Sequence, residues 1–268
     1  MSDMSKNCLI LAPPLCGARV LAKHLVNIGY SAGPRCLPSR LDPSESSFED
    51  EQTVYLNAKL FAEHKSVNSW NHAANDNAFS FFLDFKPQQV TWPNALAAPV
   101  LLAMQQKQPW VRKDPQFIFT CRYWKMNVWE TSPNRPSGVF IARYPVDWIA
   151  AIMSRCDEGI WPHIPKDVDY LAGLWVDYME HMMRILDTPS CAASAMVLTL
   201  DHLCLPEWQQ KLSLHLGLST QLMPDIQANH IRHSSRRDLQ RADRNLAEIW
   251  NRWQWLVLRS GNGIEKPA

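Results

Sequence analysis

The chain has 268 residues, 46% of them hydrophobic, which is enough to bury the core of one domain spanning residues 1–268 without disulfide staples. Its 27 Lys and Arg against 26 Asp and Glu leave a formal charge of +1, so neither nucleic acid nor an acidic membrane is expected as a partner. The seven cysteines are odd in number and never spaced as Cys-x-x-Cys, which predicts neither a disulfide framework nor a metal site. No stretch approaches the roughly 18 apolar residues of a transmembrane helix, and a cytoplasmic location is expected.

The first predicted elements are a strand, a tight loop and a helix. Cys8–Ala12 is a compact apolar run followed by two prolines, which is typical of a buried parallel strand. Apolar residues recur at helical spacing from Ala18 to Gly29, and Gly29 provides a C-terminal stop. This order predicts the start of an α/β protein.

The turn between them, Pro13–Gly17, is a candidate phosphate site. A strand that turns sharply into a helix points unpaired backbone N–H groups and the positive end of the helix dipole at one spot. No Gly-Lys-Ser/Thr follows the turn, so a standard ATPase or GTPase is disfavoured. A turn of this composition is equally compatible with a purely structural role.

Residues 31–100 are predicted to form a loop-rich substrate or lid region. Prolines and a Ser/Asp/Glu cluster predict an exposed loop at 31–52, followed by a helix over about 51–64. Residues 67–98 are polar and irregular, which indicates a long connection or lid.

Strands and helices alternate again in the second half of the chain. The expected strands are Trp110–Lys113, Val139–Ala142 and Ala195–Leu200, and helices are expected after Pro115, from Pro145 to about Arg155, and at 167–187, 206–216 and 238–258. This alternation predicts an α/β fold in three layers, with a mostly parallel sheet flanked by helices.

Several motifs occur in an order that indicates a family. They are Pro14–Leu21, Phe48-Glu49, Leu56-Asn57, Trp110–Pro115 running on to Tyr123-Trp124, and Phe140–Asp147, with weaker matches at Val197–Leu203 and Ile231–His233. Together they cover most of the chain and resemble the bacterial branch of the sulfotransferase family. The resemblance implies a P-loop-like nucleotide-binding core and 3′-phosphoadenosine-5′-phosphosulfate as co-substrate, without a metal.

The resemblance also implies roles for particular residues. In the family, the loop holds the 5′-phosphosulfate end of the donor and an arginine binds the 3′-phosphate. By analogy with phosphoryl transfer, a cation at the leaving oxygen carries much of the catalysis, and Lys113 is the candidate for that role. The candidate donor-binding residues are Leu15, Cys16, Gly17, Ala18, Arg19, Val20, Arg143, Ala151, Arg155 and Arg232, and the candidate catalytic residues are Lys113, Arg19, Asp114 as first candidate base and Glu49 as second.

The chain departs from the family pattern at three of these positions. Leu15 replaces an Arg or Lys, Ala18 replaces a Thr, and Ala151 replaces a serine on the 3′-phosphate. Arg19 lies close by in sequence and could supply the missing charge. Each lost hydrogen bond to a charged group costs about 1.5–3 kcal/mol, which weakens donor binding without forbidding it.

The charged residues also have structural interpretations. Lys113 and Asp114 could form an ordinary surface ion pair, Arg143 could cap its turn through Asp147, and Arg155 could be a solvated helix-end charge.

Three functional hypotheses follow from the sequence. The first is a sulfotransferase acting on a hydroxyl or amine of a small molecule, lipid or saccharide. The second is a non-catalytic family member that binds a nucleotide bisphosphate or a partner protein. The third is a small-molecule kinase, which the absent Walker lysine argues against. The sequence does not name the acceptor or the oligomeric state.

Overall fold

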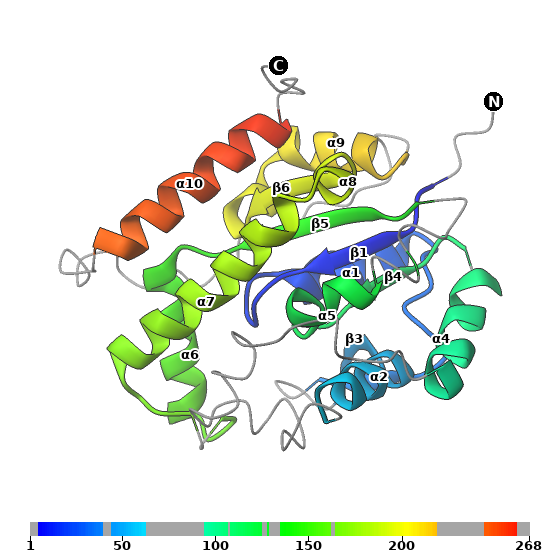
Figure 1. The fold of residues 1–268 in the computed structure, drawn as a ribbon, viewed down its shortest axis with the longest axis horizontal. Coiled ribbons are helices and arrows are strands. Elements are labelled where there is room, and N and C mark those ends of the chain that lie inside the picture. Colours follow the sequence, from blue (N-terminus) through cyan, green and yellow to red (C-terminus); the bar gives the residue numbers. More distant parts are fainter. Residues whose placement is uncertain are drawn as a thin grey trace.

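The computed structural model describes residues 5–39, 44–62, 94–106, 108–124, 128, 135–161, 164–218 and 244–261. In these ranges a parallel sheet holds, in spatial order, β4 (Val111–Lys113), β1 (Cys8–Leu11), β5 (Ser137–Ala142) and β6 (Ala195–Thr199) (Figure 1). Helices flank this sheet. The predicted α/β fold with a mostly parallel sheet is confirmed.

The described ranges contain the expected helices and two that were not expected, α4 and α8. They are α1 (Ala18–Asn27), α2 (Glu51–Ala62), α4 (Asn94–Gln106), α5 (Phe117–Trp124), α6 (Pro145–Asp157), α7 (Val168–Leu186), α8 (Pro189–Ala192), α9 (Pro206–His215) and α10 (Arg244–Gly261), with a 3-10 turn η4 (Leu200–Cys204). Pro145 and Pro206 begin α6 and α9, where the missing N–H has no intrahelical partner to lose. Asp167 caps α7 by accepting a hydrogen bond from the backbone N–H of Asp169 at 2.8 Å.

Two segments differ from the prediction. Residues 31–52 were expected to be an exposed loop, but β2 (Cys36–Pro38) and β3 (Ser46–Asp50) pair there as antiparallel strands. β2 has only 3 residues and ends in a proline, so it is too short to display strand alternation. The irregular connection expected at 67–98 is wrong from residue 94, where α4 begins. Its Ala, Leu, Met and Gln residues favour a helix, and residues 67–93 lie outside the described ranges.

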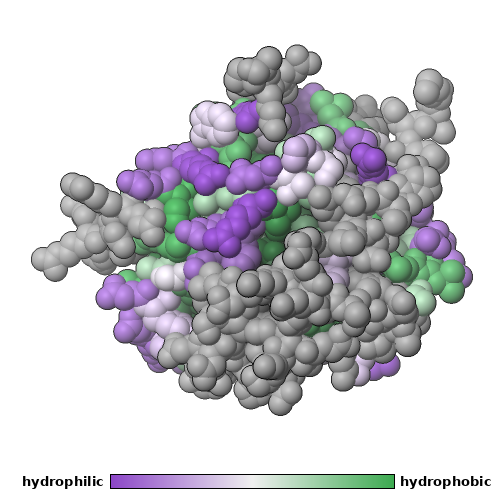
Figure 2. All heavy atoms as spheres, in the orientation of Figure 1, coloured by the Kyte–Doolittle hydropathy of each residue, from purple (hydrophilic) through white to green (hydrophobic). Residues whose placement is uncertain are grey.

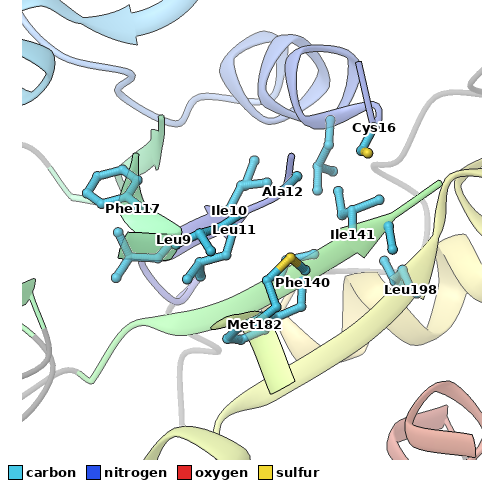
Figure 3. Close-up of a cluster of buried hydrophobic side chains, with 14 of the residues drawn as sticks. Leu9, Ile10, Leu11, Ala12, Cys16, Phe117, Phe140, Ile141, Met182 and Leu198 are labelled. Atoms are coloured by element: carbon cyan, nitrogen blue, oxygen red, sulfur yellow. The ribbon is translucent and has the colours of Figure 1, made fainter. Parts of the chain in front are cut away.

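The core is built on the central strands. No residue of β1 is more than 1% exposed. Figure 3 shows why: Ile10 points toward α1 on one side of the sheet, whereas Leu11 and Phe140 lie with Met182 of α7 on the other. A strand covered on both faces needs apolar residues at every position. This explains the uninterrupted apolar run from which the strand was predicted.

The outer edge of β6 is covered by α10. Ser260 Oγ accepts a hydrogen bond from the backbone N–H of Val197 at 3.1 Å, and its hydroxyl hydrogen is within reach of two carbonyls, that of Val197 at 3.2 Å and that of Val257 at 3.1 Å. An edge strand otherwise presents main-chain groups such as those of Val197 to other chains. The indole Nε1 of Trp253 also joins α10 to β6, by donating to the Leu198 carbonyl at 3.2 Å.

All four strands run in the same direction, so the segments that follow them meet at one edge. The register pairs Ile10 with Lys113, and Leu11 with Phe140. The turn Pro13–Gly17, Asp114, Arg143 and η4 therefore lie at the carboxyl edge of the sheet, where ligands bind in such folds.

Within the residues that the structure describes, no helix combines the length and the apolar character needed to cross a membrane.

Candidate functional site

The loop after β1 contains two residues in left-handed backbone conformations. They are Leu15 and Gly17, with φ of 60° and 91°, on either side of Cys16. Residues that alternate in this way can turn successive backbone N–H groups to one side, the arrangement called a nest. At Gly17 a Cβ atom would lie 2.5 Å from Leu200 Cδ1 and 3.0 Å from Leu203 Cδ1 of η4. Glycine is therefore required here both by conformation and by space.

Arg143 lies against this loop. It is the first residue after β5, it is 8% exposed, and its Nη1 donates to the carbonyl oxygen of Leu15 at 3.5 Å. Burial lowers the pKa of Arg143, and the nearby acidic groups of Cys16, Asp147 and Asp201 oppose that shift. An arginine keeps its charge under such a shift. The structure thus brings a cation and the turn Pro13–Gly17 together.

Two buried tryptophans donate indole hydrogen bonds to the turn Pro13–Gly17 and to Arg143. Trp148 Nε1, from α6, donates to the carbonyl oxygen of Pro14 at 2.7 Å. Trp175 Nε1, from α7, donates to the carbonyl oxygen of Arg143 at 3.2 Å. Both tryptophans are 0% exposed.

Lys113 forms an ion pair with Glu49 at the end of β4. Its Nζ lies 2.5 Å from Glu49 Oε1, and the two side chains are 9% and 23% exposed. Glu49 belongs to β3, directly after Phe48, which has a φ of 58°. Lys113 is thus paired with Glu49 in a shielded position, rather than with Asp114 at the surface.

Asp114 belongs to a buried hydrogen-bond network. One carboxylate oxygen accepts from the backbone N–H of Gln116 at 2.9 Å, and the other accepts from Asn57 Nδ2 at 2.8 Å. Asn57 Oδ1 in turn accepts from Thr120 Oγ1 and from Trp124 Nε1, both at 2.9 Å. Asp114 therefore fixes the start of α5 and ties it to α2.

Burial raises the pKa of Asp114 to about 7, and the negative charge of Glu49 adds to that rise. The hydrogen bonds from Asn57 and Gln116, and the charge of Lys113, act in the opposite direction. Asp114 is 4% exposed, and both of its carboxyl oxygens accept hydrogen bonds from groups within the protein.

The fold occurs in solved sulfotransferases. A sulfotransferase from Alicyclobacillus acidocaldarius matches with a TM-score of 0.53 and 12% identity, over 94% of this chain and 96% of that chain. The chain has a sulfotransferase-type fold. The sulfotransferase domain of the Synechococcus PCC 7002 olefin synthase (TM-score 0.41, 10% identity, 97% of this chain and 95% of that one) is also similar. The sulfotransferase domain of the curacin biosynthetic pathway is similar as well, with a TM-score of 0.44 and 14% identity over 98% of this chain and 99% of that one.

No model of a known protein family matches the sequence, and no curated protein matches it. At the identities above, the likeness concerns the sulfotransferase fold and not the reaction.

Two of the arginines predicted at the donor site have other partners. Arg19 forms an ion pair with Glu45, and its Nε donates to the carbonyl of Ser46 at 3.2 Å, so its side chain extends toward the start of β3. Arg155, in the last turn of α6, forms an ion pair with Glu158. The structure does not bring either guanidinium into contact with Arg143 or Lys113.

The remaining predicted donor-binding positions are unevenly placed. Leu15, Ala18 and Val20 are partly exposed around the loop, and Ala151 lies in the middle of α6. Arg232 lies outside the described residues. The assignment of these residues to the donor stays a prediction.

A groove of about 370 Å³ lies elsewhere, between the second half of α7 and α10. Figure 2 shows that the face over these helices is largely hydrophilic. The groove is lined by Glu180, Met183, Arg184, Asp187, Glu248, Ile249 and Arg252, and ion pairs join Glu180 to Arg184 and Asp187 to Arg252. It includes no residue of the turn Pro13–Gly17, and mutually paired charges do not mark it as a site.

Three residues at the site were given no role from the sequence. For Trp148 and Trp175 the reason is that periodicity shows which face of a helix is buried but not where an indole N–H points. Asn57 is the exception with a usable signal. A polar residue inside the Leu56-Asn57 motif of a buried helix face must find hydrogen-bond partners.

Proposed function

We propose that this chain is a sulfotransferase that moves the sulfuryl group of 3′-phosphoadenosine-5′-phosphosulfate to a hydroxyl or amine acceptor. The observation that carries the proposal is the contact between Arg143 and Leu15 at the carboxyl edge of the sheet. It joins a nest of backbone N–H groups to a guanidinium, and these are the two kinds of group that bind phosphates most readily.

The residues fit a doubly phosphorylated donor. The N–H groups from Cys16 to Arg19 would hold the 5′-phosphate, where among the described residues no side chain caps the start of α1. Arg143 would bind the 3′-phosphate through its planar guanidinium. When bound, the donor supplies an activated sulfuryl group whose transfer leaves negative charge on the bridging oxygen.

Lys113 and Glu49 are the proposed transfer residues. Lys113 would neutralise the leaving oxygen, as cations do in the related phosphoryl transfers. Of the two predicted bases we favour Glu49, because its carboxylate is partly exposed, whereas both oxygens of Asp114 accept hydrogen bonds inside the protein. Asp114 would then position the end of β4, and Glu49 would accept the proton of the acceptor.

A non-catalytic nucleotide-binding protein is the second candidate. The observation in its favour is the ion pair between Arg19 and Glu45. Arg19 was expected to replace the Arg or Lys that the family has at the position of Leu15, but this ion pair holds its guanidinium away from the loop. In this case Arg143 and the nest would bind a bisphosphate without transfer.

Binding and transfer separate these candidates. We expect 3′,5′-adenosine bisphosphate at a hundred times its Kd to add about 2.7 kcal/mol of stability and raise the Tm by roughly 5–10 °C, more than ATP does. Arg143→Ala should abolish the shift, whereas Arg184→Ala, which removes an exposed arginine paired with Glu180, should keep it. A shift with ATP alone would favour the kinase and contradict both candidates.

Transfer of labelled sulfate from the donor to a panel of hydroxyl and amine acceptors then identifies the enzyme. Activity lost in Lys113→Ala with bisphosphate binding retained would support the sulfotransferase. Binding without transfer to any acceptor would support the non-catalytic protein.

The acceptor class remains a small molecule, lipid or saccharide, and a cytoplasmic location is part of the proposal. None of the seven cysteines, all of which the structure describes, forms a disulfide, and this suits a reducing compartment.

A further inference from the structure

Both segments of the proposed donor site are held at a backbone carbonyl by a buried indole. Trp148 Nε1 binds the Pro14 carbonyl at 2.7 Å, and Trp175 Nε1 binds the Arg143 carbonyl at 3.2 Å. The tryptophans come from different helices, α6 and α7. Both indole rings are 0% exposed. Burying a ring in the core does not by itself require that its N–H donate to a carbonyl of this site.

Trp148 links the two segments to each other. Its backbone N–H donates to the Tyr144 carbonyl at 2.9 Å, which places its main chain in the turn that follows Arg143. Its side chain reaches the loop after β1. One rigid, two-torsion side chain thus sets the separation between the loop and the arginine turn.

The bond to Pro14 also sets the direction of an amide. The carbonyl of Pro14 and the N–H of Leu15 belong to one planar trans peptide, so they point in opposite directions. When the indole holds that carbonyl against α6, the N–H of Leu15 must point away from α6. The loop cannot hold itself in this way, because Pro13 and Pro14 have no N–H group and Leu15 takes a costly positive φ of 60°.

Trp175 supports the arginine turn in the same manner. Its ring lies 6.2 Å from that of Trp250 in α10, and the Trp250 ring packs edge-on against Tyr144 at 5.4 Å. The residue after Arg143 is therefore packed by one tryptophan while the carbonyl of Arg143 is held by another.

We propose that Trp148 and Trp175 are positioning residues that preorganise the donor-binding loop and Arg143 through their indole N–H groups. This inference rests on the proposed function, since it concerns the same site. Preorganisation raises affinity because less motion is lost on binding.

The alternative is that both residues are merely core, and the chain contains a matched control. Trp253 is also 0% exposed and also donates its indole N–H to a carbonyl, that of Leu198 in β6, at 3.2 Å. Trp→Phe at any of the three positions removes one indole hydrogen bond and leaves a similar small cavity. Only two of the three bonds end on a proposed donor-binding segment.

The experiment compares Trp148→Phe, Trp175→Phe and Trp253→Phe with the wild type. We expect similar losses of Tm in all three, but affinity for 3′,5′-adenosine bisphosphate, measured by calorimetry, about tenfold weaker only in Trp148→Phe and Trp175→Phe. Equal affinity in all three variants would overturn the inference. If Trp148→Phe does not fold, Trp175→Phe against Trp253→Phe decides.

A readout without ligand separates this inference from the proposed function. The backbone amide NMR resonances of Leu15 and Cys16, which report the orientation of these peptide groups, should shift or broaden in Trp148→Phe and stay unchanged in Trp253→Phe. If the wild type does not bind the bisphosphate, the proposed function fails, and the NMR result still shows whether the indole holds the loop. Amide resonances that are unchanged in Trp148→Phe would count against the positioning role.

Discussion

The two halves of the candidate site are held together by different kinds of bond. The donor half, which is the turn Pro13–Gly17 with Arg143, is held by neutral indole–carbonyl hydrogen bonds. The transfer half, which is Lys113, Asp114 and Glu49, is held by an ion pair and a buried carboxyl network. Neutral bonds do not titrate, whereas the Asp114 carboxyl, whose pKa burial raises to about 7, does. The comparison teaches that loop geometry should be insensitive to pH, while the transfer half should respond to it.

The largest expected effect is in the donor half, at Gly17. Gly17→Ala places a Cβ atom 2.5 Å from Leu200 Cδ1 at a φ of 91°, so we expect a loss of about 2–5 kcal/mol from overpacking and backbone strain together. Gly29→Ala is the matched control, since Gly29 also has a positive φ, of 106°, but nothing lies within 4 Å of its added Cβ. Urea denaturation should show that Gly29→Ala loses only about 1–2 kcal/mol of unfolding free energy, which is the cost of the backbone conformation alone. Equal losses would show that contact with η4 is unimportant.

The next effect is in the transfer half, at Asn57. Asn57→Ala removes the buried hydrogen bonds that Asn57 makes with Asp114, Thr120 and Trp124, so we expect a loss of about 2–4 kcal/mol. Asn57 does not touch the donor half, and bisphosphate affinity should stay within about twofold of wild type in the variant that folds. A large loss of affinity would mean that the two halves are coupled rather than independent.

The effect that tests the pH contrast is at Asp114. Burial raises its pKa in the folded protein to about 7, above the unfolded value of about 4, so its contribution to stability falls as the pH rises from about 4 to about 7. Asp114→Asn removes this titration but also one hydrogen-bond acceptor, a cost of about 1 kcal/mol.

The free-energy difference between wild type and Asp114→Asn should therefore be largest near pH 4 and shrink up to about pH 7. Urea denaturation at several pH values measures it. A constant difference would show that Asp114 does not titrate in this range.

Much of this arrangement was predictable because it depends on local patterns. Apolar runs such as Cys8–Leu11 gave the central strands, and the parallel order then placed Gly17, Lys113 and Arg143 at one edge. The exact partners of charged side chains were not predictable. Lys113 finds Glu49, 64 residues earlier, and Arg19 finds Glu45, 26 residues later, through a short strand pair that shows no sequence periodicity.

The partners of the indole N–H groups were not predictable from the sequence either. Burial of Trp148 follows from the apolar stripe of its helix, but the atom that its N–H meets lies 134 residues away in sequence. Such a partner depends on the crossing of α6 with the loop after β1, which no local pattern encodes.

The packing of α10 against β6 affects the tendency of the protein to self-associate. At Val197 the Ser260 hydroxyl takes the main-chain N–H, and it shares its hydrogen between the carbonyls of Val197 and Val257, so a visiting strand would not find the N–H donor free. Ser260 lies in the last turn of α10, where fraying comes most easily. Self-association through the sheet would thus be governed by the integrity of one helical turn, and Ser260→Ala should reduce solubility on storage more than it lowers the melting point.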